Sequence, residues 1–290
     1  MGGREWALLA VLAILWGSSF MMAEIALRHI PPFTLVLMRV SAAAALLCLT
    51  LRGRGANLNF IWRRRRCYIV MALLGSALPF AGFSWGQQYI DSSLAGMLNS
   101  TTPLFAIVFA WMTAEEPVRW RRLAGLVLGA IGVGILLNPS ADDTDMMIWG
   151  SLAALAASAS YAVMAIYARR RATAFAPMEN ACGQLTWSAI LLLPVSFMVE
   201  APWQLSWLPA QAMVAAMGMA FFSTYCAFLL YFYLLRKIGA VNVTQVAFMI
   251  PLVAVVLGAG LLGESLGMIF FVGAGLVLLG LLVANRRAKT

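Results

Sequence analysis

The chain has 290 residues, of which 63% are hydrophobic and only 11% are charged. A soluble domain carries charge on about 25% of its residues, so this chain cannot cover itself with a water-compatible surface. Each membrane span uses about 20 apolar residues, so about ten spans leave only short loops and no separate soluble domain. The net charge of +9 comes from short arginine clusters between apolar runs. The chain has no basic face with interleaved aromatic residues, which argues against a nucleic-acid partner.

Apolar runs follow one another along the whole chain. They lie near residues 6–27, 33–51, 67–89, 92–112, 120–137, 147–168, 178–198, 208–235, 240–261 and 267–285. Prolines fall between runs, at Pro32, Pro139 and Pro202 among others, where they interrupt a helix at least cost. The first run is longer than the apolar core of a usual signal peptide and has a counterpart later in the chain, so we expect it to be retained. The pattern predicts an all-α integral membrane protein with ten transmembrane helices.

Charges of opposite sign alternate between the loops. With the N-terminus inside, every basic residue except Arg28 and Arg39 falls in an inner segment, and the largest cluster is Arg63–Arg66. The outer segments hold the acidic residues Asp91, Asp142, Asp143, Asp145, Glu200 and Glu264. Loops rich in arginine and lysine stay in the cytoplasm, so we expect both termini to be cytoplasmic.

An internal repeat divides the chain into two parts. Pro103 matches Pro251 and Glu116 matches Glu264 at an offset of 148, and Trp16 matches Tyr161 at an offset of 145. We predict five-helix units over residues 1–140 and 141–290. Five is an odd number, so the two units enter the membrane in opposite directions. Inverted repeats are typical of secondary transporters; duplication in a channel or in an inert membrane protein is the alternative.

The glycines Gly125, Gly129, Gly132 and Gly134 superficially resemble a dinucleotide-binding motif. They lie inside a predicted membrane span with no preceding strand, so the motif lacks its structural context. Small residues at such spacing allow two helix backbones to approach closely. We therefore predict that these glycines pack against another helix.

Several short motifs resemble the EamA family of the drug/metabolite transporter superfamily. They are Leu15-Trp16-Gly17-Ser18-Ser19-Phe20, Pro31-Pro32-Phe33-Thr34-Leu35 with Arg39, Ser93-Leu94-Ala95-Gly96, Thr102-Pro103-Leu104-Phe105, Glu115-Glu116 and, in the second unit, Pro251-Leu252 and Gly263-Glu264. Within the family the chain is most similar to the YddG-type exporters of aromatic amino acids, although Tyr161 stands where tryptophan is usual. The resemblance implies ten helices, cytoplasmic termini and a central cavity open to one side at a time.

Polar residues interrupt two of the predicted spans just before a proline. Asn99, Thr101 and Thr102 precede Pro103, and Gln245 precedes Pro251. Proline clashes with the carbonyl four residues earlier, so the carbonyl of Asn99 is expected to be loosened and open to a ligand. Polar groups in mid-membrane should face protein or a water-filled cavity. Hydrogen bonding between helices is the alternative role, and for Thr101 and Gln245 it stands beside ligand binding as an equal possibility.

Aromatic residues recur on the first, third, sixth and eighth predicted helices. Each alone is favoured as core packing, but as a set they suit an apolar or aromatic ligand. The candidate substrate-binding residues are Trp16, Phe20, Leu78, Phe83, Asn99, Thr101, Thr102, Tyr161, Tyr225, Gln245, Phe248 and Met249.

Two ionisable residues, Glu24 and Arg39, flank the Pro31-Pro32 turn at equal distance from it. On an antiparallel helix pair they could meet as a structural ion pair. The alternative is that one of them contacts substrate or carries a proton.

The absence of several metal-binding, catalytic and nucleotide-binding motifs narrows the possible functions further. The chain has one histidine, His29, so a histidine metal cluster is impossible and a Ser-His-Asp triad would have to use this residue. The phosphate-binding motif of ATPases is absent. We therefore expect no catalytic residue, no metal, no cofactor and no enzyme activity.

Taken together, the sequence predicts a secondary transporter that exports small metabolites, including aromatic amino acids, by alternating access. The predicted location is the bacterial inner membrane, as a multi-pass protein surrounded by lipid and functional as a monomer. Transport of other metabolites or drug-like cations is the alternative of the same class. An intramembrane enzyme and a membrane scaffold are the alternatives of different classes.

Overall fold

A computed structural model describes residues 2–113, 120–137, 145–171, 176–205, 207–239, 243 and 245–285. These residues form helices and no strand. The helices are α1 (Gly3–Leu27), α2 (Pro32–Gly53), α3 (Phe60–Arg63), α4 (Arg65–Ala72), η1 (Leu73–Ala77), α5 (Leu78–Gly86), α6 (Ser92–Asn99), α7 (Thr102–Met112), α8 (Trp120–Leu136), α9 (Asp145–Arg171), α10 (Pro177–Val199), η2 (Pro202–Gln204), α11 (Ala210–Gly218), η3 (Met219–Cys226), α12 (Ala227–Ile238), α14 (Val246–Leu257), η4 (Gly258–Leu262) and α15 (Met268–Asn285).

The predicted apolar runs correspond to these helices. Seven helical runs in the described part of the chain are long and apolar enough to cross a membrane, and two more, Val246–Leu262 and Met268–Ala284, are shorter apolar helices. The all-helical prediction is therefore confirmed, while the count of ten spans and the cytoplasmic position of the termini stay predictions. Glu116, Asp142 and Asp143, which entered the repeat and the charge pattern, lie outside the described residues.

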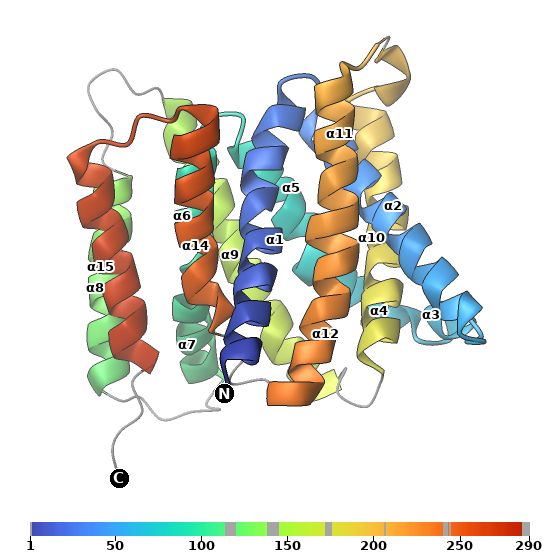
Figure 1. Cartoon of the computed structure of the whole chain (residues 1–290), viewed down its shortest axis with the longest axis horizontal. Helices are drawn as coiled ribbons and strands as arrows, with labels where there is room; N and C mark the ends of the chain where they lie inside the picture. The colour runs from blue at the N-terminus through green and yellow to red at the C-terminus, as the bar shows by residue number, and fades with distance from the viewer. Residues whose placement is uncertain are drawn as a thin grey trace.

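Helices of the N-terminal half (residues 1–140) pack chiefly against helices of the C-terminal half (residues 141–290). The most extensive pairings are α8 with α15, α2 with α10, α5 with α9 and α1 with α14, and each of them joins the two halves. In Figure 1, α8 and α15 form one side of the molecule, α1 and α14 lie near the middle, and α2 and α10 lie toward the other side. The interface between the halves is thus the core of the bundle.

Glycines bring α8 and α15 into backbone contact. A methyl group on Gly125 would lie 2.5 Å from the carbonyl oxygen of Gly280, and one on Gly132 would lie 2.7 Å from that of Gly273. Gly129 similarly faces the side chain of Leu104, whereas Gly134 faces open space. The predicted close packing is confirmed for the first three glycines and is wrong for Gly134.

Three membrane helices contain π-helical segments, η1, η3 and η4. A π-helical turn shifts the backbone ladder by one residue and leaves carbonyls in need of other donors, and such turns are frequent at functional sites. In η1 the carbonyl of Leu74 accepts a hydrogen bond from the hydroxyl of Ser160 on α9 at 2.8 Å. In η3 the hydroxyl of Thr224 donates to the carbonyl of Met219 at 3.1 Å. η1 packs against α9 and η3 packs against α2, both at the interface of the halves.

Candidate functional site

The helix from Ser92 to Met112 is broken at the predicted polar run. α6 ends at Asn99 and α7 begins at Thr102. The hydroxyl of Thr101, 2% exposed, donates to the carbonyl of Leu98 at 2.6 Å, and the hydroxyl of Thr102 donates to the carbonyl of Asn99 at 2.8 Å. The carbonyl predicted to be open to a ligand is therefore satisfied within its own turn.

Hydrogen bonding also crosses from the other half to this break. The hydroxyl of Ser158 on α9 donates to the carbonyl of Leu98 at 3.0 Å. This agrees with the structural role that the sequence left open for Thr101. The side chain of Asn99 is half-buried and makes no hydrogen bond within the described residues, so its amide remains open to a ligand.

An aromatic set joins the two halves at the centre of the bundle. The rings of Phe20 on α1 and Phe83 on α5 are 5.6 Å apart, edge to face. Phe83 stacks on Tyr161 of α9 at 6.2 Å, and Tyr161 also meets Phe80 of α5 edge to face at 6.4 Å. We call Phe20, Phe80, Phe83 and Tyr161 the aromatic set. Rings in edge-to-face and offset-stacked contact stabilise one another and together present an apolar surface.

A second aromatic contact lies on the α12 side of α1. The ring of Trp16 is 5.6 Å from that of Tyr231, and both side chains are half-buried. Trp16 and Met249 pack against the same buried cluster, to which Phe20 and Phe83 belong. The structure thus brings Trp16, Phe20, Phe83, Tyr161 and Met249 into one connected region. That they bind substrate stays a prediction.

Four other predicted substrate-binding residues have different surroundings. The hydroxyl of Tyr225 is 2.8 Å from that of Thr50, within the α2–η3 contact. Phe248 packs against a separate cluster that contains Leu104 and Leu281. Leu78 is 55% exposed, and Gln245 is exposed at the start of α14. Tyr225 packs against the buried cluster that contains Phe80 and that Tyr161 also contacts. No hydrogen bond or ring contact within the described residues joins Leu78, Gln245 or Phe248 to the aromatic set.

Arg39 is 8% exposed and lies on α2 at the interface of the halves. Its Nε donates a hydrogen bond of 2.9 Å to Oγ1 of Thr224 in η3, and its guanidinium carbon lies 4.0 Å from the centre of the Phe80 ring. Arg39 therefore touches the aromatic set through Phe80. Sequence reasoning missed Thr224, although a hydroxyl pair at Ser223-Thr224 within a long apolar run was a signal that could have found it.

The predicted ion pair between Glu24 and Arg39 is wrong. Glu24 Oε1 is 3.7 Å from Nη2 of Arg28, one turn later on the same helix, and Glu24 Oε2 accepts the backbone N–H of Ser92 at 3.0 Å. The sequence placed both residues at equal depth, but depth does not fix which way a side chain points around its helix. Glu24 turns toward α6, whereas Arg39 turns toward η3.

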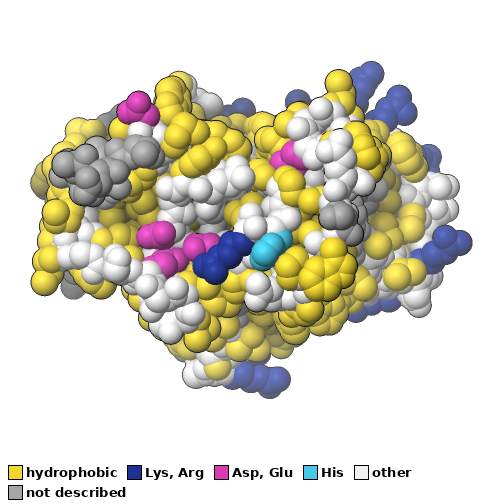
Figure 2. Space-filling view, turned by 90° about the horizontal axis from the view of Figure 1, so that it is seen from above, with side chains coloured by type: hydrophobic (Ala, Val, Ile, Leu, Met, Phe, Trp, Pro, Cys, Tyr) yellow, Lys and Arg dark blue, Asp and Glu magenta, His cyan; other side chains and the backbone are white. Residues whose placement is uncertain are grey.

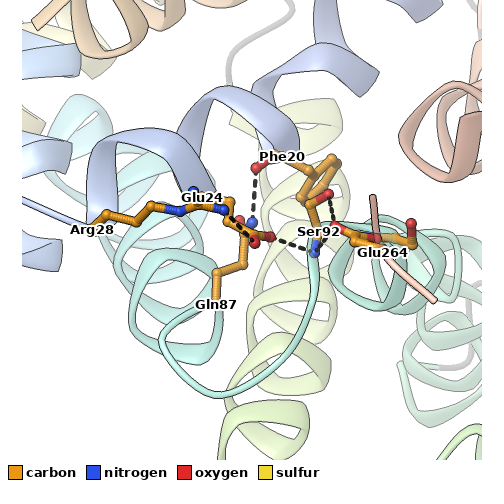
Figure 3. A network of polar contacts seen from close by, with 7 residues as sticks. Phe20, Glu24, Arg28, Gln87, Ser92 and Glu264 are labelled. Carbon is orange, nitrogen blue, oxygen red and sulfur yellow. Dashed lines mark hydrogen bonds and ion pairs between the residues drawn. The ribbon is translucent and has the colours of Figure 1, made fainter. Parts of the chain in front are cut away.

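Glu24 belongs to a network at one end of the bundle, shown in Figure 3. Glu264, after η4, accepts the backbone N–H groups of Ser92 at 3.0 Å and Ser93 at 3.1 Å, as well as the Ser92 hydroxyl. The amide of Gln87 donates to the carbonyl of Phe20 at 2.8 Å. We call the end that holds Glu24, Asp91, Glu200 and Glu264 the acidic end.

A second carboxylate caps α2 at the same end. Glu200, just after α10, accepts the backbone N–H groups of Phe33 at 2.8 Å and Thr34 at 2.6 Å. The first N–H groups of a helix have no partner within it, and a carboxylate there also meets the positive end of the helix dipole. Figure 2 views the acidic end face on: acidic, basic and histidine side chains lie together between apolar surfaces. Residues of the C-terminal half thus fix the N-termini of α2 and α6.

The described residues offer no group of three or more His, Cys, Asp and Glu side chains that could hold a metal ion. The central region itself offers several kinds of side chain to a ligand. It combines an apolar aromatic surface, one guanidinium and one open amide. Such a surface can bind a small molecule with an apolar body and a polar head.

Comparisons with known proteins agree with this architecture. The uncharacterized inner membrane transporter YedA of Escherichia coli K12 is 29% identical over 284 residues, covering 96% of this chain and 89% of that protein. The uncharacterized transporter YvbV of Bacillus subtilis is 25% identical, covering 99% and 93%. A crystal structure of a protein with 17% sequence identity superposes with a TM-score of 0.66 and covers 98% of this chain and 97% of its own.

The family assignment rests on nearly the whole chain. The model of the EamA-like transporter family matches twice, over residues 4–138 and over residues 148–286. The relatives are named as transporters, and the helices of this chain are apolar and long enough for a multi-pass membrane protein, which confirms the predicted location. This chain is a multi-pass membrane protein that belongs to the EamA-like transporter family.

Proposed function

We propose that this protein is a secondary transporter that exports amino acids, aromatic ones included, by alternating access. Transport of small molecules follows from the family. The amino-acid substrate, the outward direction and the alternating mechanism are the parts that we add. They agree with a central region that is apolar and aromatic on one side and polar at Asn99 and Arg39.

The observation that carries the proposal is the aromatic set itself. Phe20 and Phe83 come from the N-terminal half and Tyr161 from the C-terminal half, so a ligand held against these rings touches both halves. Relative motion of the halves would then expose the ligand to one side or the other. In inverted-repeat transporters the substrate lies at such an interface.

The proposed mechanism also uses the repeat. We propose that residues 1–140 and 141–290 are two inverted five-helix units. The double match to one family model supports the duplication. The interlocked pairings of α1 with α14 and α5 with α9 would let one unit rock against the other about the aromatic set.

Counterflow in proteoliposomes tests the proposal. Liposomes containing the purified protein are loaded with one unlabelled amino acid and diluted into a trace of the same compound in radioactive form. We expect transient accumulation for phenylalanine, tyrosine or tryptophan, and none in protein-free liposomes. A panel of sugars and quaternary amines runs in parallel. Accumulation of only these compounds would overturn the amino-acid substrate while leaving the family's transport activity intact.

A further inference from the structure

Arg39 is a buried cation, and no carboxylate among the described residues pairs with it. It lies seven residues from the first residue of α2, Pro32, which places it about 10 Å inside that end of the helix. Among the described residues it contacts the hydroxyl of Thr224 and the ring of Phe80, and it interacts electrostatically with the uncharged Tyr161. None of these groups carries a compensating negative charge.

The carboxylates in the described part of the chain are directed elsewhere. Glu24 contacts Arg28 and Ser92, Glu179 contacts Arg64, Glu5 contacts Lys237, Glu200 caps α2, Glu264 caps α6, and Asp91 and Asp145 begin α6 and α9. A charged side chain within a membrane helix is costly and usually marks a substrate or ion pathway. Removing water from a charge without supplying a partner is the most unfavourable arrangement. Within the described part of the chain Arg39 has no counter-ion, which points to one supplied by a ligand.

The contacts of Arg39 leave one part of the guanidinium free. Nε is occupied by Thr224, whose own hydroxyl hydrogen goes to the carbonyl of Met219. Phe80 covers one face of the planar group at 4.0 Å. The terminal amino groups, Nη1 and Nη2, make no hydrogen bond to a described residue and form a pair of parallel donors. This fork matches the two oxygens of a carboxylate.

The surroundings of Arg39 suit the remainder of such a ligand. Phe80 contacts Arg39 and also meets Tyr161, which stacks on Phe83. A carboxylate on the fork would therefore have its attached carbon chain beside the aromatic set. Thr224, which accepts the hydrogen bond from Nε of Arg39, lies in the π-helical segment η3.

We propose that Arg39 binds the carboxylate of the transported molecule, and that Thr224 and Phe80 are positioning residues for its guanidinium. The inference rests on the proposed function for the place of the substrate and deepens it by naming the required group. Substrates are then carboxylates with an apolar body. Permanently cationic compounds without a carboxylate are not substrates.

Ligand binding to the wild-type protein in lipid nanodiscs tests the requirement directly. Four compounds share one ring and differ at the head: phenylalanine, 3-phenylpropionate, phenylalaninamide and phenethylamine. We expect the two carboxylates to bind, and the amide and the amine to bind at least about tenfold more weakly, because a charge-assisted hydrogen-bond pair is lost. Equal binding of phenethylamine and phenylalanine would overturn the proposal.

Variants locate the effect at Arg39. Arg39→Gln should lose the preference for carboxylates, and Arg39→Lys should keep part of it because the charge remains without the fork. Arg52→Gln, at the exposed far end of the same helix, is the matched control and should bind like wild type. Unchanged carboxylate binding by a folded Arg39→Gln protein would also overturn the proposal. If Arg39→Gln fails to fold, Arg39→Lys and the four-compound series on wild type still test whether Arg39 binds the carboxylate.

A wider screen separates this inference from the proposed function. Thermal shifts are measured with aliphatic and aromatic carboxylates that are not amino acids, and with chloride at constant ionic strength. Arg39-dependent stabilisation by such carboxylates, with no response to amino acids, sinks the amino-acid substrate but supports the carboxylate site. Stabilisation by chloride alone, or by no carboxylate at all, contradicts the carboxylate site.

Discussion

Glu264 accepts the backbone N–H of Ser93 at 3.1 Å, so a carboxylate near the end of the chain caps a helix of the N-terminal half. The same carboxylate accepts the N–H of Ser92. Glu200 does the same for α2 through Phe33 and Thr34. Both contacts hold the halves together at the acidic end.

Glu264→Ala should lower the free energy of unfolding by about 1–2 kcal/mol, because the N–H of Ser93 loses its acceptor and that of Ser92 keeps only Glu24. Glu264→Gln should lower the free energy of unfolding by a smaller amount, since an amide oxygen still accepts a hydrogen bond but carries no charge. Thermal denaturation in detergent measures the change. Asp145→Asn, an exposed acidic residue in the first turn of α9, is the control with a smaller expected effect. Equal losses for the two positions would show that the cap contributes nothing.

Glu24 and Arg39 should behave as independent sites. They share no partner, so the effects of Glu24→Gln and Arg39→Gln on thermal stability should add to within about 0.5 kcal/mol. Glu24 and Glu264 both accept from the N–H of Ser92, so that pair serves as the coupled control and should deviate from additivity. Strong coupling between Glu24 and Arg39 would restore the ion pair that the structure contradicts.

The α8–α15 contact should tolerate no methyl group at Gly125. Gly125→Ala places a carbon 2.5 Å from the carbonyl oxygen of Gly280, and overpacking of this kind costs about 1–3 kcal/mol. Gly134→Ala lies on the same helix and faces open space. It should be neutral or slightly stabilising, because alanine favours a helix. Urea or thermal unfolding of the two variants gives the comparison, and similar losses would refute the close contact.

The orientation predicted from charge can be tested at two exposed residues. In a background without native cysteines, Gln88→Cys at the acidic end should react with a membrane-impermeant maleimide added to intact cells. Arg65→Cys, in the arginine cluster, should react only after the membrane is opened. The reverse labelling pattern would show that the protein has the opposite orientation in the membrane.

Sequence patterns predicted the helices well because membrane spans depend on length and apolarity, which are local properties. The close packing at Gly125 was also predicted, because small residues at helical spacing allow two helices to approach. The rings of Phe20, Phe83 and Tyr161 meet in the structure, while their role in binding substrate stays a prediction. Glu24 and Arg39 were paired wrongly because rotation of each helix about its axis is set by packing.

The hydrogen bonds at the α6–α7 break could not be predicted for a related reason. The loosened carbonyl of Asn99 is satisfied by Thr102, three residues later, and such local hydroxyl bonds compete with a ligand for the same atom. The partnership of Arg39 with Thr224 depends on the π-helical register of η3. No periodicity in the sequence reports that register.

We expect the substrate to lie against aromatic side chains between the two halves. Trp16→Ala and Tyr161→Ala remove apolar area there, so they should reduce counterflow of tryptophan about 10-fold or more and that of alanine much less. Trp207→Ala and Tyr89→Ala, at exposed positions, are the matched controls and should transport both substrates like wild type. Expression and thermal stability are measured alongside to confirm folding. If folded Trp16→Ala and Tyr161→Ala proteins transport tryptophan and alanine at wild-type rates, the substrate does not lie against these side chains.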